Sequence, residues 1–270
     1  MTAARFSLDD LRHLMARLRD PEAGCPWDLK QDFQSIVPYT LEETYELADA
    51  IASEDLDQIR QEMGDVLFQL IFYSRLAEEQ SAFDFDDVVD GITRKLLRRH
   101  PHVFPAGTLE SRRSSDAPEE AQIKQRWEEI KAEERGEKAQ HSALDDIPQA
   151  LPAASRASKL QKRASQLGFD WENIEGVVDA LHDELAELRE AMQAGEQAAI
   201  EDELGDVLFS VVNLSRHLGL DAEATLRKAG QKFERRFRFV EARAEVSEGV
   251  SATPRSQLED FWREAKEAGL

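Results

Sequence analysis

Four carboxylates in the second half of the chain have the types and spacing of a divalent-cation site. Glu184 and Glu187 are three residues apart, and Glu203 and Asp206 repeat that spacing. Residues three apart on an α-helix share a face, so each pair projects from one side of its helix. Oxygen ligands favour Mg²⁺ or Mn²⁺, or Ca²⁺, over zinc and copper. A di-iron bundle needs Glu-x-x-His, and none of the six histidines has a glutamate three residues before it. We therefore expect these four residues to hold a divalent cation: Mg²⁺, Mn²⁺ or Ca²⁺.

The same four positions recur 141 residues earlier, where Glu43, Glu46, Glu62 and Asp65 occupy them without a gap in the surrounding alignment. An acidic helix surface explains one such pair easily, but two pairs repeated at identical spacing are hard to explain in that way. Two unit charges about 5 Å apart repel by about 3 kcal/mol at an effective dielectric of about 20, so facing carboxylates need protons or cations. The first copy is therefore a second candidate metal site.

Cationic and aromatic side chains could meet a substrate that carries phosphate. Lys232 and Arg236 are four residues apart and share a helix face, as do Trp262 and Lys266. An indole can stack on a nucleobase while ammonium and guanidinium groups meet phosphates. We expect these four residues to bind the substrate, although Trp262 could also be a core aromatic and the three cations could simply be solvated.

The two copies differ along the stripe that follows the second acidic pair. Three positions carry polar residues in the second copy and mostly apolar residues in the first: Ser210, Asn213 and His217 against Gln69, Phe72 and Leu76. A desolvated triphosphate needs polar partners. We therefore expect the second copy to be the functional site, with Asn213 among its substrate-binding residues. The first copy is expected to be degenerate, structural or regulatory.

These residues require helices to position them. Helical spacing of apolar residues dominates the chain, and alternating strand patterns are scarce. Breaks near Gly195 and at Ser53-Glu54 make each acidic pair of helices antiparallel neighbours. The sequence predicts an all-α protein of two tandem four-helix-bundle-like units. We expect an N-terminal unit at 1–104, a linker with a charged helix at 105–152, and a C-terminal unit at 153–270.

Composition excludes several classes of partner. The 270 residues carry 55 Asp and Glu against 34 Lys and Arg, a net charge of −21, which repels nucleic-acid phosphates. No apolar run approaches the roughly 20 residues of a membrane span. The single Cys25 excludes an intrachain disulfide and a multi-cysteine metal site. We expect a cytoplasmic protein that binds neither nucleic acid nor membrane.

The motifs resemble those of a known family. Glu-Glu-x-x-Glu, sixteen residues from Glu46 to Glu62, and then Glu-x-x-Asp are similar to the signature of the all-α nucleoside triphosphate pyrophosphohydrolases. Their order in both halves resembles the tandem MazG family, with the segments GCPWD, PYTLEETYE, RRHPHVF, HSALDDIP, GFDW and KFERRF. The resemblance runs from about Leu11 to Lys266. One departure is Asp183-Glu184, where the first copy has Glu42-Glu43.

The resemblance implies a homodimer of helical bundles that hydrolyses nucleoside triphosphates, with Mg²⁺, to the monophosphate and pyrophosphate. It points to the C-terminal copy as the catalytic one, with Glu184, Glu187, Glu203 and Asp206 as catalytic residues that hold Mg²⁺, for which Mn²⁺ can substitute. Water would attack the α-phosphorus, and stacking on any base favours a broad range of ribo- and deoxynucleotides. Three alternatives stay open: a narrower house-cleaning enzyme for non-canonical or deoxynucleotides, a non-catalytic nucleotide or alarmone sensor, and a purely structural helical adaptor.

Overall fold

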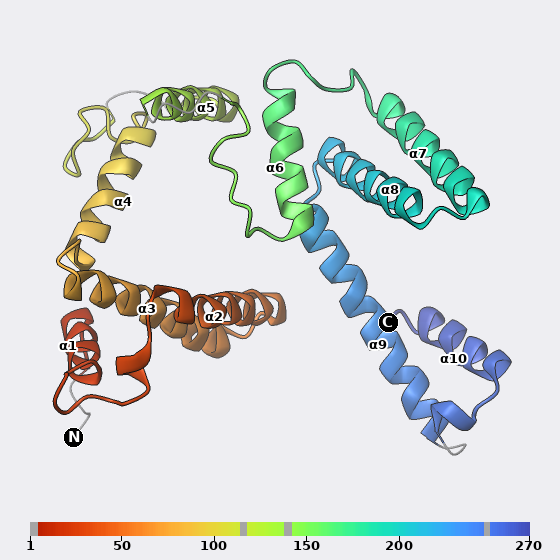
Figure 1. The fold of residues 1–270 in the computed structure, drawn as a ribbon, viewed down its shortest axis with the longest axis horizontal. Helices are drawn as coiled ribbons and strands as arrows, with labels where there is room; N and C mark the ends of the chain where they lie inside the picture. Colours follow the sequence, from red (N-terminus) through yellow and green to blue (C-terminus); the bar gives the residue numbers. More distant parts are fainter. Residues whose placement is uncertain (1–4, 114–117, 138–141, 246–248) are drawn as a thin grey trace. The chain divides into compact units, whose positions relative to one another are not determined.

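The computed structural model describes residues 5–113, 118–137, 142–245 and 249–270, and these residues form helices without a strand. The α-helices are, in order, α1 (Leu8–Leu18), α2 (Phe33–Ser53), α3 (Leu56–Glu79), α4 (Phe85–Arg99), α5 (Glu120–Glu137), α6 (Ala153–Ser165), α7 (Ile174–Ala194), α8 (Gln197–His217), α9 (Ala222–Glu245) and α10 (Arg255–Glu267) (Figure 1). Two short 3-10 helices, η1 (Asp28–Lys30) and η2 (Val250–Ala252), lie between them. Within the described ranges, no helix combines the length and apolarity of a membrane span. The all-α prediction is confirmed.

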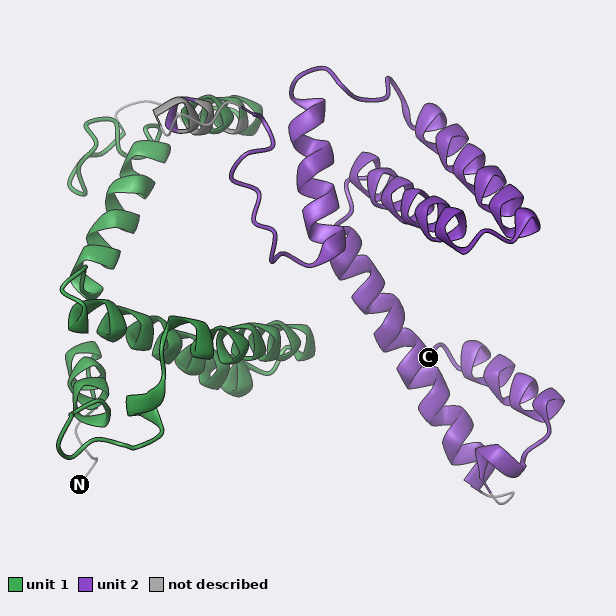
Figure 2. Ribbon diagram, viewed as in Figure 1, with its two compact units in different colours: residues 1–132 green, residues 133–270 purple. Residues whose placement is uncertain are grey.

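The chain divides into two compact units, unit 1 (Met1–Ala132) and unit 2 (Glu133–Leu270) (Figure 2). Each unit holds one acidic helix pair. Most of α5 falls in unit 1, whereas the sequence predicts that this helix belongs to a linker at 105–152. The bounds of the linker and of the two predicted units stay predictions. Two stretches of the linker, 114–117 and 138–141, lie outside the described residues, and so does the first residue of the HSALDDIP segment.

In unit 1, α2 and α3 pack as an antiparallel pair (Figure 1). The Asp32 side chain accepts a hydrogen bond from the backbone N–H of Ser35 and begins α2 with a capping box. The chain reverses at Glu54, which adopts the left-handed conformation with φ of 59°. Asp55 then caps α3. The predicted break at Ser53-Glu54 is confirmed.

The core of unit 1 lies between α1, α2 and α3. Its buried side chains are Met15, Ile36, Ile71, Phe72 and Leu76. Two of them, Phe72 and Leu76, occupy the stripe on α3 that continues from the acidic residues. The first copy therefore uses this stripe for packing.

In unit 2, α7 and α8 form the equivalent pair, and the turn between them is at Gly195 with φ of 75°. Gly195 occupies the position of Glu54 in the repeat. The left-handed backbone conformation costs less free energy for glycine than for glutamate, because glycine has no Cβ atom. Helix α6 packs against α8 and α9. Helix α9 continues away from α8, and α10 folds back against its second half (Figure 1). These helices bury few large side chains in the described part of unit 2.

Candidate active site

Helices α7 and α8 bring the second acidic cluster together. Glu184 and Glu187 come from α7, and Glu203 comes from α8. One carboxylate oxygen from each lies within 4.8 Å of the others, close enough to hold one metal ion. Asp206, the fourth predicted ligand, is not in this convergent set, but its charge acts on Glu184. The geometry therefore brings three of the four predicted residues to one point.

Burial and mutual repulsion shape the charge of this cluster. Burial is the main cause that raises the pKa of Glu184 above its ordinary value, and the charges of Asp206, Glu187 and Glu203 raise it further. Desolvation likewise raises the pKa of Glu203, with repulsion from Glu187 and Asp206 added. A cation would relieve this repulsion, so the donor set fits a hard divalent ion that prefers oxygen ligands.

A pocket of about 640 Å³ opens beside the cluster in unit 2, and Glu184 lines both. Its walls come from α6, the loop before α7, α7 itself and α8. The lining combines aromatic and polar side chains: Phe169, Trp171, Phe209, Ser210, Asn213 and Arg216. Sites for small organic ligands have this mixture of apolar walls and a few placed polar groups. The predicted polar stripe of the second copy thus contributes Ser210 and Asn213 to a cavity.

An ion pair fixes one wall of the pocket. Arg216 on α8 binds both carboxylate oxygens of Asp170, with 2.9 Å between Nη1 and Oδ2. His217 Nε2 lies 3.0 Å from Asp170 Oδ1. The hydrogen bond from Arg216 is the main cause that lowers the pKa of Asp170 to about 2. Sequence reasoning named His217 in the polar stripe but missed Asp170 and Arg216, although the GFDW segment contains Asp170.

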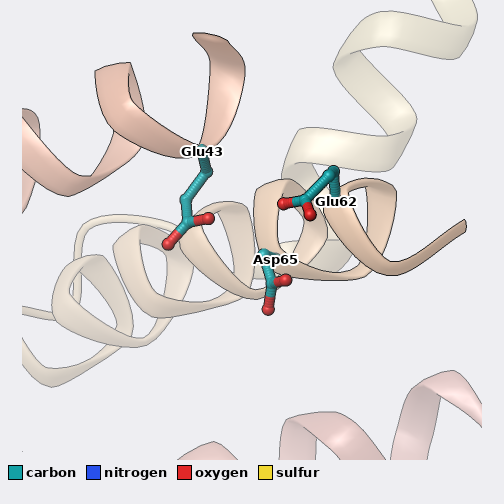
Figure 3. Close-up of side chains that lie close together, drawn as sticks. All are labelled: Glu43, Glu62 and Asp65. Atoms are coloured by element: carbon teal, nitrogen blue, oxygen red, sulfur yellow. The ribbon is translucent and has the colours of Figure 1, made fainter. Parts of the chain in front are cut away.

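Unit 1 assembles a similar acidic cluster with a different third member. Glu43 on α2 reaches toward Glu62 and Asp65 on α3 (Figure 3), and one oxygen from each lies within 4.8 Å of the others. Glu46 is outside this set. Burial is the main cause that raises the pKa of Glu43, as for Glu184. Beyond the cluster, Phe72 is fully buried in the core, whereas Asn213 at the same position in unit 2 lines the pocket.

The predicted cationic and aromatic set lies on α9 and α10. The Arg236 guanidinium lies 5.9 Å from the centre of the Trp262 ring, and its Nε donates to the backbone oxygen of Leu270 at 2.7 Å. Lys232 and Lys266 are exposed. In the described chain, no hydrogen bond or ion pair joins these four side chains to the acidic cluster of unit 2, and none of them lines the pocket. Their role in substrate binding stays a prediction.

Comparison with known proteins identifies the repeated unit. The model of the MazG nucleotide pyrophosphohydrolase domain matches residues 31–104 and 172–240. A nucleoside triphosphate pyrophosphohydrolase of Escherichia coli strain K12 is 52% identical over 263 residues, which cover 96% of this chain and 97% of the relative. The Thermotoga maritima nucleoside triphosphate pyrophosphohydrolase/pyrophosphatase MazG is 42% identical over 267 residues, 98% of each chain. Bacillus subtilis YabN, an uncharacterized protein, is 39% identical over 259 residues, 95% of this chain and 51% of YabN. Both acidic clusters fall inside the matched segments, and the chain therefore belongs to the MazG nucleotide pyrophosphohydrolase family, with the domain present twice.

Proposed function

We propose that this chain hydrolyses nucleoside triphosphates to the nucleoside monophosphate and pyrophosphate, with Mg²⁺, at the acidic cluster of unit 2. The observation that carries the proposal is that Glu184 belongs both to the carboxylate cluster and to the 640 Å³ pocket. A triphosphate bound at the cluster can therefore place its nucleoside in the pocket. The names of the Escherichia coli and Thermotoga maritima relatives support this reaction.

The carboxylates of the cluster would hold the ion, with Glu184, Glu187 and Glu203 as convergent ligands and Asp206 beside them. When bound, Mg²⁺ supplies charge neutralisation for the phosphates and lowers the pKa of water. The water oxygen attacks the α-phosphorus, the bond from that phosphorus to the bridging oxygen breaks, and pyrophosphate leaves. A carboxylate beside the cluster accepts the proton of the water. Phosphoryl transfer asks the protein mainly for such positioning and charge stabilisation.

Lys232, Arg236, Trp262 and Lys266 are proposed to act on the phosphate and nucleoside ends of the substrate. Arg236 and Trp262 already lie against each other, which pairs a cation with an aromatic face. Aromatic walls at Phe169 and Trp171 accept any base by stacking, so a broad range of ribo- and deoxynucleoside triphosphates is the main proposal. A narrower preference for deoxynucleotides or non-canonical nucleotides fits the same pocket.

We also propose that two copies of the chain form a homodimer. Leu204, Leu208 and Val211 follow helical spacing on α8, and Leu208 is 61% exposed. On α9, Leu226 is 69% and Phe233 is 58% exposed. Monomers rarely leave so many large apolar side chains in water, and the described core of unit 2 is small. Analytical ultracentrifugation should therefore give twice the chain mass for the wild type and a lower mass for Leu208→Glu. A monomeric wild type would contradict this part of the proposal.

A cytoplasmic location and the absence of nucleic-acid and membrane partners stay predictions from the sequence.

Product identification tests the reaction. With ATP, dATP or GTP and Mg²⁺, ³¹P NMR should show the monophosphate and pyrophosphate; a diphosphate and orthophosphate would refute the cleavage position. Glu203→Gln should abolish turnover, whereas the matched Glu62→Gln in unit 1 should keep most of it. The reverse result would assign catalysis to unit 1. Tight binding of Mg²⁺ and triphosphate without any turnover would favour the alternative of a nucleotide or alarmone sensor.

A further inference from the structure

The ion pair between Asp170 and Arg216 joins two walls of the pocket. Asp170 belongs to the loop that also carries Phe169 and Trp171, and Arg216 lies near the end of α8. Both partners are largely shielded, with 26% of the Asp170 side chain and 18% of the Arg216 side chain exposed. The backbone N–H of Trp171 also donates to Asp170 Oδ1 at 3.0 Å. The pair therefore fixes the aromatic loop against α8.

Arg216 also sets the orientation of the Asn213 side chain. Arg216 Nε and Nη2 lie 3.1 Å and 2.8 Å from Asn213 Oδ1. Arginine can only donate hydrogen bonds, so the atom of Asn213 that faces it must be the amide oxygen. Among the described residues, the amide nitrogen of Asn213 has no acceptor, and Asn213 lines the pocket. Its NH₂ group is therefore a donor available to a bound ligand.

Unit 1 lacks this arrangement at the same positions of the repeat. Arg75, the counterpart of Arg216, pairs along its own helix with Glu78 at 3.1 Å and Glu79 at 2.9 Å. Phe72 replaces Asn213, and Pro26 stands where unit 2 has Asp170. A direct ion pair between the second acidic helix and the loop thus accompanies the pocket in unit 2. In unit 1, the end of α3 reaches the corresponding loop through Arg19, which pairs with Glu79 and donates to the backbone oxygens of Asp28 and Gln31.

We propose that Asp170 and Arg216 are positioning residues for the nucleoside: they hold the Phe169–Trp171 wall in place and orient Asn213 so that its amide donates a hydrogen bond to an acceptor atom of the nucleobase. The acceptor is a ring nitrogen or a carbonyl oxygen, which every common base carries. The proposal rests on the proposed function, because it takes the pocket as the nucleoside end of the site. It predicts that changes at Asp170, Arg216 or Asn213 weaken the binding of the nucleoside and leave the binding of the triphosphate unchanged.

Two near-isosteric variants test this role with two probes. The dissociation constants of α,β-methylene-ATP and of inorganic tripolyphosphate are measured by calorimetry in the presence of Mg²⁺. Asn213→Asp replaces the donor by an acceptor, and Asp170→Asn removes the charge that holds Arg216. Each variant should weaken the affinity for the nucleotide analogue by about tenfold or more, as expected when a hydrogen-bond partner is left unsatisfied. The affinity for tripolyphosphate should stay within about twofold of the wild type. The matched control is Asp90→Asn, which breaks an exposed Arg–Asp pair on α4.

Turnover separates this proposal from the proposed function. In the variants, KM for ATP should rise about tenfold while kcat stays within about twofold, a split that a general loss of folding would not produce. Unchanged affinity for the analogue in both variants overturns the positioning role, even if the wild type releases pyrophosphate. An equal loss of affinity for tripolyphosphate also overturns it. If the variants lose affinity for the nucleotide analogue alone but the wild type releases no pyrophosphate, the proposed reaction is refuted and the positioning role stands.

Discussion

Replacing Glu203 by Gln should uncouple the stability of unit 2 from Mg²⁺. Glu203 contributes one of the three convergent oxygens, and its pKa is raised by desolvation and by the neighbouring charges. The substitution keeps the size of the side chain and removes both a ligand and a source of repulsion. We therefore expect a metal-free protein at least as stable as the wild type, together with a smaller stabilisation by Mg²⁺.

The size of the effect follows from the length of the unit. Unit 2 runs from residue 133 to 270, and an unfolding entropy of about 2.1 cal/mol/K per residue makes 1 kcal/mol equal to roughly 3 °C in Tm. Mg²⁺ at about 100 times its Kd stabilises the folded state by about 2.7 kcal/mol, or roughly 9 °C. If the loss of one ligand weakens Kd about tenfold, the same Mg²⁺ concentration gives about 1.4 kcal/mol, or roughly 5 °C.

Differential scanning calorimetry with and without Mg²⁺ measures both quantities. Glu259→Gln is the matched control, because Glu259 forms an exposed pair with Arg255 on α10 and 62% of its side chain is exposed; it should keep the full Mg²⁺ shift. A Glu203→Gln protein with an undiminished shift would refute the metal site in unit 2. A metal-free variant that melts well below the wild type would refute the idea that the cluster is electrostatically strained.

Three further predictions concern the pH dependence of stability, the packing of unit 1 and the role of Trp262. Burial raises the pKa of Glu184 above its ordinary 4.5, so the folded state holds this proton more tightly than the unfolded state. The free energy of unfolding of the metal-free protein, measured in urea, should therefore fall as pH rises from about 4.5 towards neutrality. Mg²⁺ should reduce that fall. Phe72→Ala should destabilise unit 1 by about 3–5 kcal/mol in urea unfolding, because Phe72 is fully buried, while pyrophosphate release keeps most of its rate. Trp262→Ala should raise KM for ATP by about tenfold or more, because Trp262 is predicted to contact the base or the ribose. An unchanged KM in steady-state kinetics would contradict that role.

The sequence predicted the parts of this architecture that depend on local spacing. Glu-x-x-Glu and Glu-x-x-Asp placed their carboxylates on single helix faces, and the breaks at Ser53-Glu54 and Gly195 placed the paired helices side by side. From those two facts a facing cluster follows without knowledge of the remaining fold. Both clusters are therefore found where the sequence analysis expects them.

Features that depend on how helices are rotated and docked were not accessible in this way. The convergent set takes Glu187 but not Asp206 in unit 2, and Asp65 but not Glu46 in unit 1. That choice depends on the rotation of each helix about its axis, which the repeated spacing does not specify. The pocket is a further example, since Leu144 and Gln161 reach it from segments far from the acidic motifs. Arg216 was missed because its partner, Asp170, is 46 residues away in sequence.

The divergence of the two units shows how little the acidic cluster alone determines. Both units keep three carboxylate oxygens within 4.8 Å of one another, and in both, burial raises the pKa of the glutamate on the first helix. The units differ in the helical turns that follow the acidic residues on α3 and α8. There, Phe72 packs into the core of unit 1, whereas Asn213 borders a cavity in unit 2. A large apolar side chain at this position stabilises the helix pair by burial, whereas an asparagine leaves space that needs a ligand or water to satisfy its amide. Under the proposed function, unit 2 thus gives up packing to obtain a nucleoside subsite, and unit 1 retains the packing. The difference in function should therefore be decided by the residues beside the cluster and not by the acids themselves.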